Sequence, residues 1–204
     1  RGLGDVYKRQ GVSGSGELDV ATRLAKATGR VDFSLHRVFD LLTPKAQRWL
    51  RLYQWSEAPV VTGTVQAPLP EWTNPKPDWR AEVRPTLTLN GQVTSGPMSF
   101  RGIEVESARS DLAYSDLTWR LPNLVARRPE GEVRMALRSH TGTQDYQIDF
   151  RSSIDPHAVT PALEEEKQKK GFDYFSFDKP PVIEGRVWGR WRERERTAFR
   201  ATVA

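Results

Sequence analysis

Residues 133 to 150 read Val-Arg-Met-Ala-Leu-Arg-Ser-His-Thr-Gly-Thr-Gln-Asp-Tyr-Gln-Ile-Asp-Phe. Apolar and polar side chains alternate on both sides of Thr141-Gly142. Successive side chains of a strand point to opposite faces of a sheet, so this alternation is typical of strands that are buried on one side only. A glycine between two such runs favours a tight turn. This stretch therefore predicts a β-hairpin with one apolar and one polar face.

Similar runs occur along most of the chain, separated by turn-forming residues, and they predict a mostly β protein in which antiparallel order dominates. The pair Asn90-Gly91 is the strongest short hairpin signal in the sequence. Before the hairpin described above, we expect strands over 18–20, 31–35, 60–65, 79–83, 86–89, 100–106, 109–114 and 117–121, with turns at Thr28-Gly29, Asn90-Gly91 and Ser115-Asp116.

Short motifs recur in the same order about 120 residues apart, which is the signature of a repeat. Val31-Asp-Phe33 returns as Ile148-Asp-Phe150, and Trp79-Arg-Ala-x-Val83 returns as Phe199-Arg-Ala-x-Val203. The segment from Pro59 to Val65 likewise resembles 181–187. These spacings predict a long, curled antiparallel sheet built from repeats, with a first unit over 18–134 and a truncated second unit over 135–204.

Each predicted unit contains one short helix. Thr43 and Thr160 can cap a helix, and each is followed by a proline, which is tolerated at the first helical position. After Pro161 three glutamates precede three lysines, an order that matches the helix dipole. We therefore expect helices over 44–53 and 161–170.

The first ten residues resemble the in-frame translation of a transposon end used to prepare sequencing libraries. We interpret Arg1 to Gln10 as an adapter-derived segment, and 1–17 as that segment with a disordered lead-in. The whole chain has 31 basic and 26 acidic residues; without this segment it has 28 and 25, a formal net charge of +3. That charge is unremarkable for a chain of this length.

One side of the predicted sheet is apolar, and one short helix per unit covers only part of it. The uncovered part is a candidate site for an acyl chain, whose burial is favourable by about 0.8 kcal/mol per CH₂. The residues expected to line such a trough are Leu87, Leu89, Leu112, Tyr114, Leu117, Trp119, Leu137, Ile148 and Phe150.

Two stretches are similar to the C-terminal region of AsmA-like proteins: Phe100-Arg-Gly-Ile-Glu-Val continued by 112–131, and Phe175 to Gly189. The resemblance implies an envelope protein of diderm bacteria, related to the AsmA and TamB group, anchored in the inner membrane by an N-terminal helix and projecting into the periplasm. It further implies phospholipid, or another acyl-chain lipid, as ligand, other envelope proteins as partners, and a role in lipid transfer or outer-membrane assembly. The anchor helix is absent from this chain, as expected of a fragment.

The sequence contains no motif that indicates catalysis or metal binding, and no cofactor is expected. The three histidines lie far apart without ligand-like neighbours, and no nucleophile motif is present. The arginines of 186–200 alternate with glutamates, which disfavours nucleic-acid binding. Seven tryptophans keep an alternative open, namely a structural, adhesin-like or carbohydrate-binding scaffold. A membrane barrel would share the alternation, but a charged, capped helix in each unit argues against it.

If Arg1 to Gln10 derives from an adapter, it contributes nothing to the core. Deleting these ten residues should leave the thermal unfolding midpoint unchanged within about one degree. A drop of several degrees in differential scanning calorimetry would show that the segment belongs to the native structure.

Overall fold

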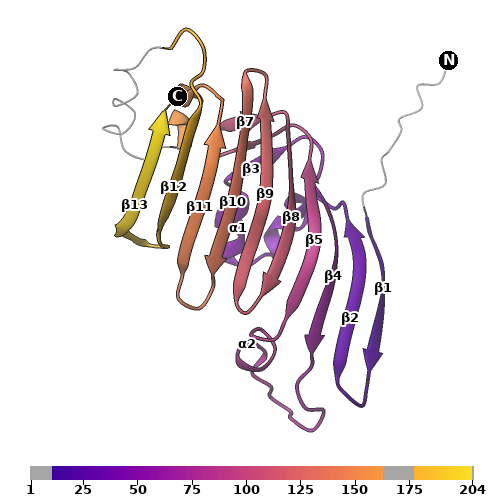
Figure 1. Cartoon of the computed structure of the whole chain (residues 1–204). Helices are drawn as coiled ribbons and strands as arrows, with labels where there is room; N and C mark the ends of the chain where they lie inside the picture. The colour runs from indigo at the N-terminus through magenta and orange to yellow at the C-terminus, as the bar shows by residue number, and fades with distance from the viewer. Residues whose placement is uncertain (1–10, 163–176, 204) are drawn as a thin grey trace, which may run out of the picture.

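The computed structural model describes residues 11–162 and 177–203, and it confirms a mostly β, antiparallel protein (Figure 1). Ten strands form one sheet in which every hydrogen-bonded neighbour is antiparallel. From one edge to the other the order is β1 (Val12–Asp19), β2 (Leu24–Val31), β4 (Val60–Pro68), β5 (Thr88–Ser95), β8 (Ser107–Ser115), β9 (Thr118–Arg128), β10 (Gly131–His140), β11 (Asp145–Ser152), β12 (Ile183–Arg190) and β13 (Glu193–Val203).

The strand register places apolar residues on one face of this sheet and polar residues on the other. In the predicted hairpin, Met135 lies opposite Phe150 and Leu137 opposite Ile148, while Arg138 lies opposite Gln147. The same division continues across the sheet, because paired residues share a face. We call these the apolar face and the polar face. Along β1, β2, β4 and β5 the apolar face carries only uncharged residues: 12, 14, 16 and 18; 25, 27, 29 and 31; 61, 63, 65 and 67; 89, 91, 93 and 95.

A second layer covers the middle of the apolar face. It is made by long connections that leave the same end of the sheet, between β2 and β4 and between β5 and β8, and it lies behind β8 to β10 in Figure 1. Its elements are the 3₁₀ helix η1 (Leu35–Leu41), the helix α1 (Pro44–Leu50) and a small antiparallel sheet of β3 (Tyr53–Trp55), β6 (Met98–Phe100) and β7 (Ile103–Val105).

Aromatic side chains hold this layer together. The ring of Tyr53 lies 4.6 Å from that of Trp49 and 4.8 Å from that of Phe100, measured between ring centroids. Leu50 is completely buried. Burial also raises the pKa of the Tyr53 hydroxyl above its ordinary value, with nearby Arg101 acting in the opposite direction. This cluster is a compact core of its own, separate from the strands at the two edges of the large sheet.

The first predicted helix is confirmed, although it is shorter than expected. The Thr43 hydroxyl accepts a hydrogen bond from the Ala46 amide at 3.3 Å, and α1 ends at Leu50 rather than at 53. The second was expected to begin at Pro161, but Thr160 and Pro161 lie inside the 3₁₀ helix η2 (Pro156–Ala162). That turn starts earlier because Asp155 accepts a hydrogen bond from the His157 amide at 2.9 Å. The rest of the predicted helix, from 163 onward, lies outside the described residues.

The predicted turns at Thr28-Gly29 and Asn90-Gly91 are wrong. Gly29 and Gly91 lie inside β2 and β5, and both face Gly63 of β4. A methyl group on Gly63 would lie 2.6 Å from the Asn90 carbonyl oxygen, so these glycines permit a close approach of neighbouring backbones. The turn of the first hairpin is instead made at 20–23, where the Asp19 carboxylate accepts hydrogen bonds from the amides of residues 21 and 22.

Two further strand predictions are wrong in detail. Residues 79–83 begin with a short helix, α2 (Trp79–Glu82), because the Asp78 carboxylate accepts hydrogen bonds from the Arg80 and Ala81 amides, each at 3.0 Å. The expected strand 100–106 is broken by a turn at 101–102, where both residues have positive φ. The turn expected at Ser115-Asp116 falls one residue later, because Asp116 and Leu117 both adopt the left-handed conformation that favours a tight hairpin.

The repeat of about 120 residues is not confirmed. The segment at Trp79 is helical whereas its expected counterpart at 199–203 is in β13, so this pair of motifs does not share a structure. The sheet is also not strongly curled, contrary to expectation. Residues 12–17, expected to be a disordered lead-in, pair with β2 along β1. The adapter-derived segment 1–10 lies outside the described residues.

The contact between Gly63 and the neighbouring strand can be tested by adding one methyl group. Gly63→Ala should lower the free energy of unfolding by about 1–3 kcal/mol, the usual cost of overpacking, because the Asn90 carbonyl must move. Gly96→Ala is the control, since nothing lies within 4 Å of a Cβ at that position. Urea unfolding measures both, and an equal effect of the two substitutions would contradict the explanation.

Candidate functional site

The apolar face brings together most of the residues predicted to line a trough. Cross-strand pairs place seven of the nine on it: Leu89, Leu112, Tyr114, Trp119, Leu137, Ile148 and Phe150. Leu87 precedes β5, and Leu117 lies in the turn between β8 and β9. The predicted set is therefore mainly one surface, centred on β8 to β11.

Much of this central surface is occupied by the protein itself. Tyr114 is only 3% exposed, and its hydroxyl donates a hydrogen bond to the Arg84 carbonyl oxygen at 3.3 Å. Its ring lies 4.8 Å from that of Trp119, which is 37% exposed. The central residues therefore form the boundary between the covered and uncovered parts of the face.

The flanks of the apolar face are open. At the β1 edge, Val12 is 73% exposed and Leu18 is 48% exposed; at the β13 edge, Phe199 is 77% exposed. Among the described residues, Figure 1 shows no layer behind β1 and β2. These flanks were not singled out by the sequence analysis, although the alternation of β13 is visible at 199–203. They are the part of the face that can accept a ligand without displacing the covering layer.

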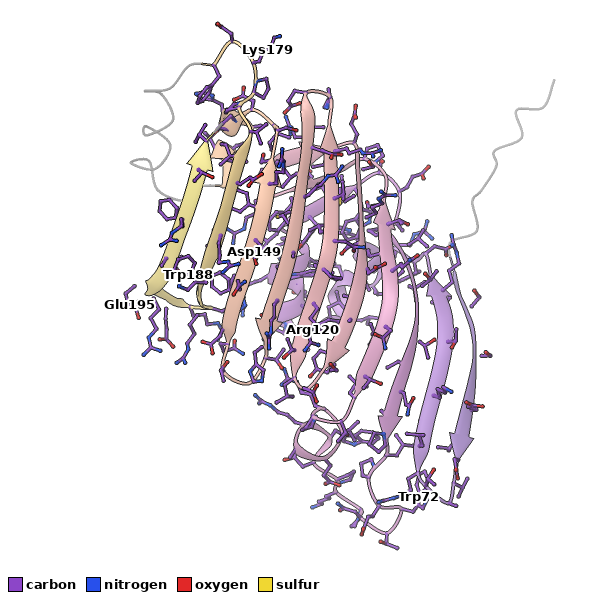
Figure 2. All side chains as sticks on the ribbon, viewed as in Figure 1. Trp72, Arg120, Asp149, Lys179, Trp188 and Glu195 are labelled. Carbon is purple, nitrogen blue, oxygen red and sulfur yellow. The ribbon has the colours of Figure 1, made fainter. Side chains whose placement is uncertain are left out.

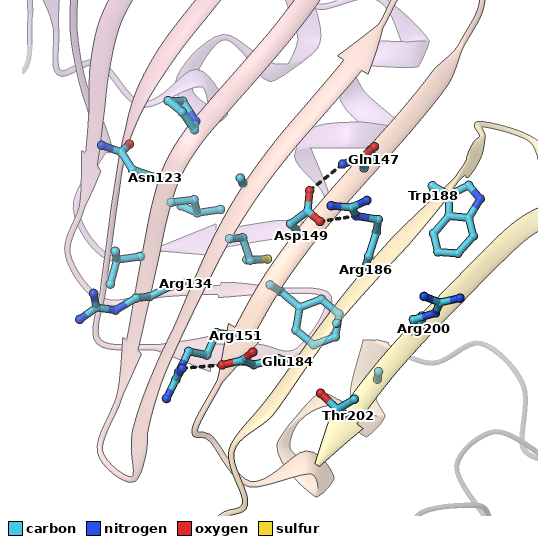
Figure 3. A pocket seen from close by; sticks show the side chains of 18 residues that line it. Asn123, Arg134, Gln147, Asp149, Arg151, Glu184, Arg186, Trp188, Arg200 and Thr202 are labelled. Atoms are coloured by element: carbon cyan, nitrogen blue, oxygen red, sulfur yellow. Dashed lines mark hydrogen bonds and ion pairs between the residues drawn. The ribbon is translucent and has the colours of Figure 1, made fainter. Parts of the chain in front are cut away.

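The polar face carries a second candidate site, a shallow trough of about 1000 Å³ across β9 to β13. Figure 2 places Asp149 and Trp188 on neighbouring strands, and the close view in Figure 3 shows their side chains on the side of the sheet opposite the helices. The register sets three rows of side chains on β11, β12 and β13: Gln147, Trp188 and Ala198; Asp149, Arg186 and Arg200; Arg151, Glu184 and Thr202.

Ion pairs organise this trough, which we call the polar trough. Arg186 pairs with Asp149, and Arg151 pairs with Glu184. The pKa of the Asp149 carboxyl lies below its ordinary value because the Gln147 amide donates a hydrogen bond to it at 2.7 Å and because Arg186 lies beside it. Asp149 is therefore ionised at neutral pH, and the row contains two guanidinium groups for one carboxylate.

From the sequence, the arginines of 186–200 were considered only as a nucleic-acid site, which the glutamates between them disfavour. The alternation Glu184-x-Arg186-x-Trp188 was a visible signal that these three side chains share a face. The partner positions on β11 and β13, however, depend on the pairing of the strands.

Neither face offers a metal site or a membrane-spanning helix within the described residues. No group of three or more His, Asp or Glu side chains is arranged to hold a metal ion there. Among residues 11–162 and 177–203, no helix combines the length and hydropathy that a bilayer-spanning segment requires.

The chain matches no protein-family model, and no curated protein or solved structure is significantly similar to it.

The lowered carboxyl pKa values predict how stability depends on pH. A carboxylate with a depressed pKa in the folded state stabilises the fold above its unfolded value of about 3.8, and this contribution is lost as the pH falls through the folded value. The thermal midpoint should fall below about pH 4, and Asp149→Asn should make that fall slightly shallower. The effect is small because Asp149 is 39% exposed and its ion pair is screened by solvent. Calorimetry from pH 2 to 7, with Asp116→Asn as control, measures it; an unchanged acid limb would contradict the assignment.

Proposed function

We propose that the protein binds the acyl chains of lipids on the open flanks of the apolar face. The observation that supports this proposal is the combination of a continuous apolar surface with a covering layer that spans only its middle. Exposed apolar area costs about 25 cal/mol per Å², so an uncovered flank is a surface that an apolar ligand stabilises.

The shape of the flank at β1 to β5 favours a thin, flexible ligand. Gly14, Gly29, Gly63 and Gly91 pair in sequence across these four strands. On one side of this row stand the larger side chains of Val12, Val31, Val61 and Val93. The surface therefore dips across the strands, between side chains that bear no charge, and offers an acyl chain apolar contact along its length.

The resemblance to AsmA-like proteins points in the same direction. It leads us to propose a periplasmic protein, anchored in the inner membrane in its full-length form, that carries phospholipid or assists outer-membrane assembly. Further strands of the same alternating kind would extend the antiparallel sheet edge to edge, and the uncovered face would lengthen with them. In this proposal the protein has no catalytic group, because transfer of a lipid along a surface breaks no covalent bond.

The proposal is tested by placing a charge on the flank. Val31 lies on the apolar face and is 37% exposed, so Val31→Asp can fold with its carboxylate in water. We expect phospholipid to co-purify with the parent chain from a diderm host, and Val31→Asp to reduce it at least fivefold, because a buried carboxylate opposes acyl-chain binding. Mass spectrometry of an organic extract, normalised to protein, measures the lipid.

Thr62→Asp is the matched control, since Thr62 is on the neighbouring strand but on the polar face. It should retain the parent amount of lipid. Circular dichroism and the thermal midpoint confirm that both variants are folded. A folded parent chain without lipid, or equal losses in the two variants, would refute acyl-chain binding and leave the alternative of a structural or carbohydrate-binding scaffold.

A further inference from the structure

The polar trough contains two arginines that face each other across neighbouring strands. Arg186 of β12 lies directly opposite Arg200 of β13, and Asp149 of β11 lies on the other side of Arg186. Like charges in directly opposite positions of a sheet are destabilising. This arrangement therefore carries an uncompensated positive charge at its β13 end.

The one carboxylate in this row is already engaged. Asp149 accepts hydrogen bonds from Gln147, at 2.7 Å, and from Arg186. The Arg200 side chain makes no hydrogen bond or ion pair with any of the described residues. Its planar guanidinium keeps donors free in the geometry that matches a carboxylate, with a second guanidinium adjacent.

An exposed aromatic ring stands beside this pair. Trp188 is two residues from Arg186 on the same face of β12 and is 40% exposed. It lies diagonal to Arg200, and such diagonal neighbours are about 7–8 Å apart, close to the width of one sugar ring with its substituent. Figure 3 shows the Trp188 ring and the Arg200 side chain along the same side of the trough. A flat apolar ring next to a cation pair suits a ligand that has an apolar face and an anionic edge.

The remaining lining groups indicate which anion fits. Two further arginines, Arg134 and Arg151, line the trough, but each is paired with a glutamate. The other polar groups are the Glu184 carboxylate, the Asn123 amide and the Thr202 hydroxyl. The last three groups can exchange hydrogen bonds with hydroxyl groups, whereas Asp149 and Glu184 interrupt the positive charge that a phosphate backbone requires. Single-stranded nucleic acid also requires successive stacking rings and an uninterrupted basic groove. Of the two aromatic residues that line the polar trough, only Trp188 lies on the polar face, since Phe150 lies on the apolar face, and the charges of the trough alternate in sign.

We propose that the polar trough binds an acidic carbohydrate, with the carboxylate of a uronic or sialic acid between Arg186 and Arg200 and a sugar ring on Trp188. Sugar hydroxyls then bond to Glu184 and Thr202. The volume of about 1000 Å³ is at the upper end for small-ligand sites and accommodates a short oligosaccharide. This site is on the face opposite the proposed acyl-chain surface, so each proposal can fail without the other.

Isothermal titration of the purified chain with trigalacturonate, a hyaluronan tetrasaccharide and sialyllactose tests the proposal, with maltotriose as the neutral sugar and a dT oligonucleotide as the nucleic-acid probe. We expect at least one acidic sugar to bind and maltotriose not to bind. Arg200→Gln and Trp188→Ala should each weaken binding about tenfold or more, the usual effect of losing a hydrogen bond to a charged group.

Arg138→Gln is the matched control. Arg138 is also an exposed arginine on the polar face, without a hydrogen bond or ion pair to the described residues, but it lies outside the lining of the trough. It should change affinity less than twofold. The thermal midpoint of Arg200→Gln should not fall, because no native contact is removed. The proposal is overturned if none of the acidic sugars binds below about 1 mM, if Arg138→Gln weakens binding as much as Arg200→Gln does, or if the oligonucleotide binds more tightly than the sugars.

Discussion

The antiparallel register of alternating strands is the constraint on which the rest of this structure depends. Once Met135 faces Phe150 and Leu137 faces Ile148, every strand added on either side must keep its apolar residues on the same face. A slip of one residue would exchange the two faces of a strand completely. The large sheet is therefore apolar on one side across all ten strands. The second layer, which includes α1 and the small sheet, covers only part of that surface.

The periodicity of the sequence was sufficient for some elements, whereas the turn of the β1–β2 hairpin was misplaced although these two strands are neighbours in the chain. The β10–β11 hairpin and β4 follow from alternation, and the start of α1 follows from Thr43 and Pro44. Local signals failed where a distant strand decides the outcome. Asn90-Gly91 is a strong turn signal, but Gly91 lies in the middle of β5 because it faces Gly63. The backbone contact between these glycines joins two different strands, so short-range sequence rules cannot predict it.

The same distinction explains what could be predicted of the sites. The apolar face can be predicted from the alternation of side chains along each strand alone. Seven of the nine proposed lining residues therefore lie on it. To predict the polar trough, one must also know how β11, β12 and β13 pair. The meeting of Arg186 with Arg200 depends on the register of β12 with β13, which shifts between Trp188 and Arg190. A shift of this kind cannot be predicted from composition or periodicity, so the sequence did not indicate that these two arginines meet.

Each face has a feature that a sheet optimised for stability alone would lack, and the two features differ in polarity. On one side Val12 and Phe199 expose large apolar surfaces, and on the other Arg200 stands against Arg186 without a carboxylate of its own. Replacing an exposed valine by threonine would reduce the exposed apolar surface without changing the backbone. Replacing Arg200 by glutamate would remove its repulsion with Arg186. Local rules are most often broken where a surface is kept for a ligand. Among the described residues, the apolar flanks have no apolar partner and the Arg200 side chain pairs with no carboxylate. The two ligands proposed for these faces therefore differ in chemistry and would bind on opposite sides of one sheet.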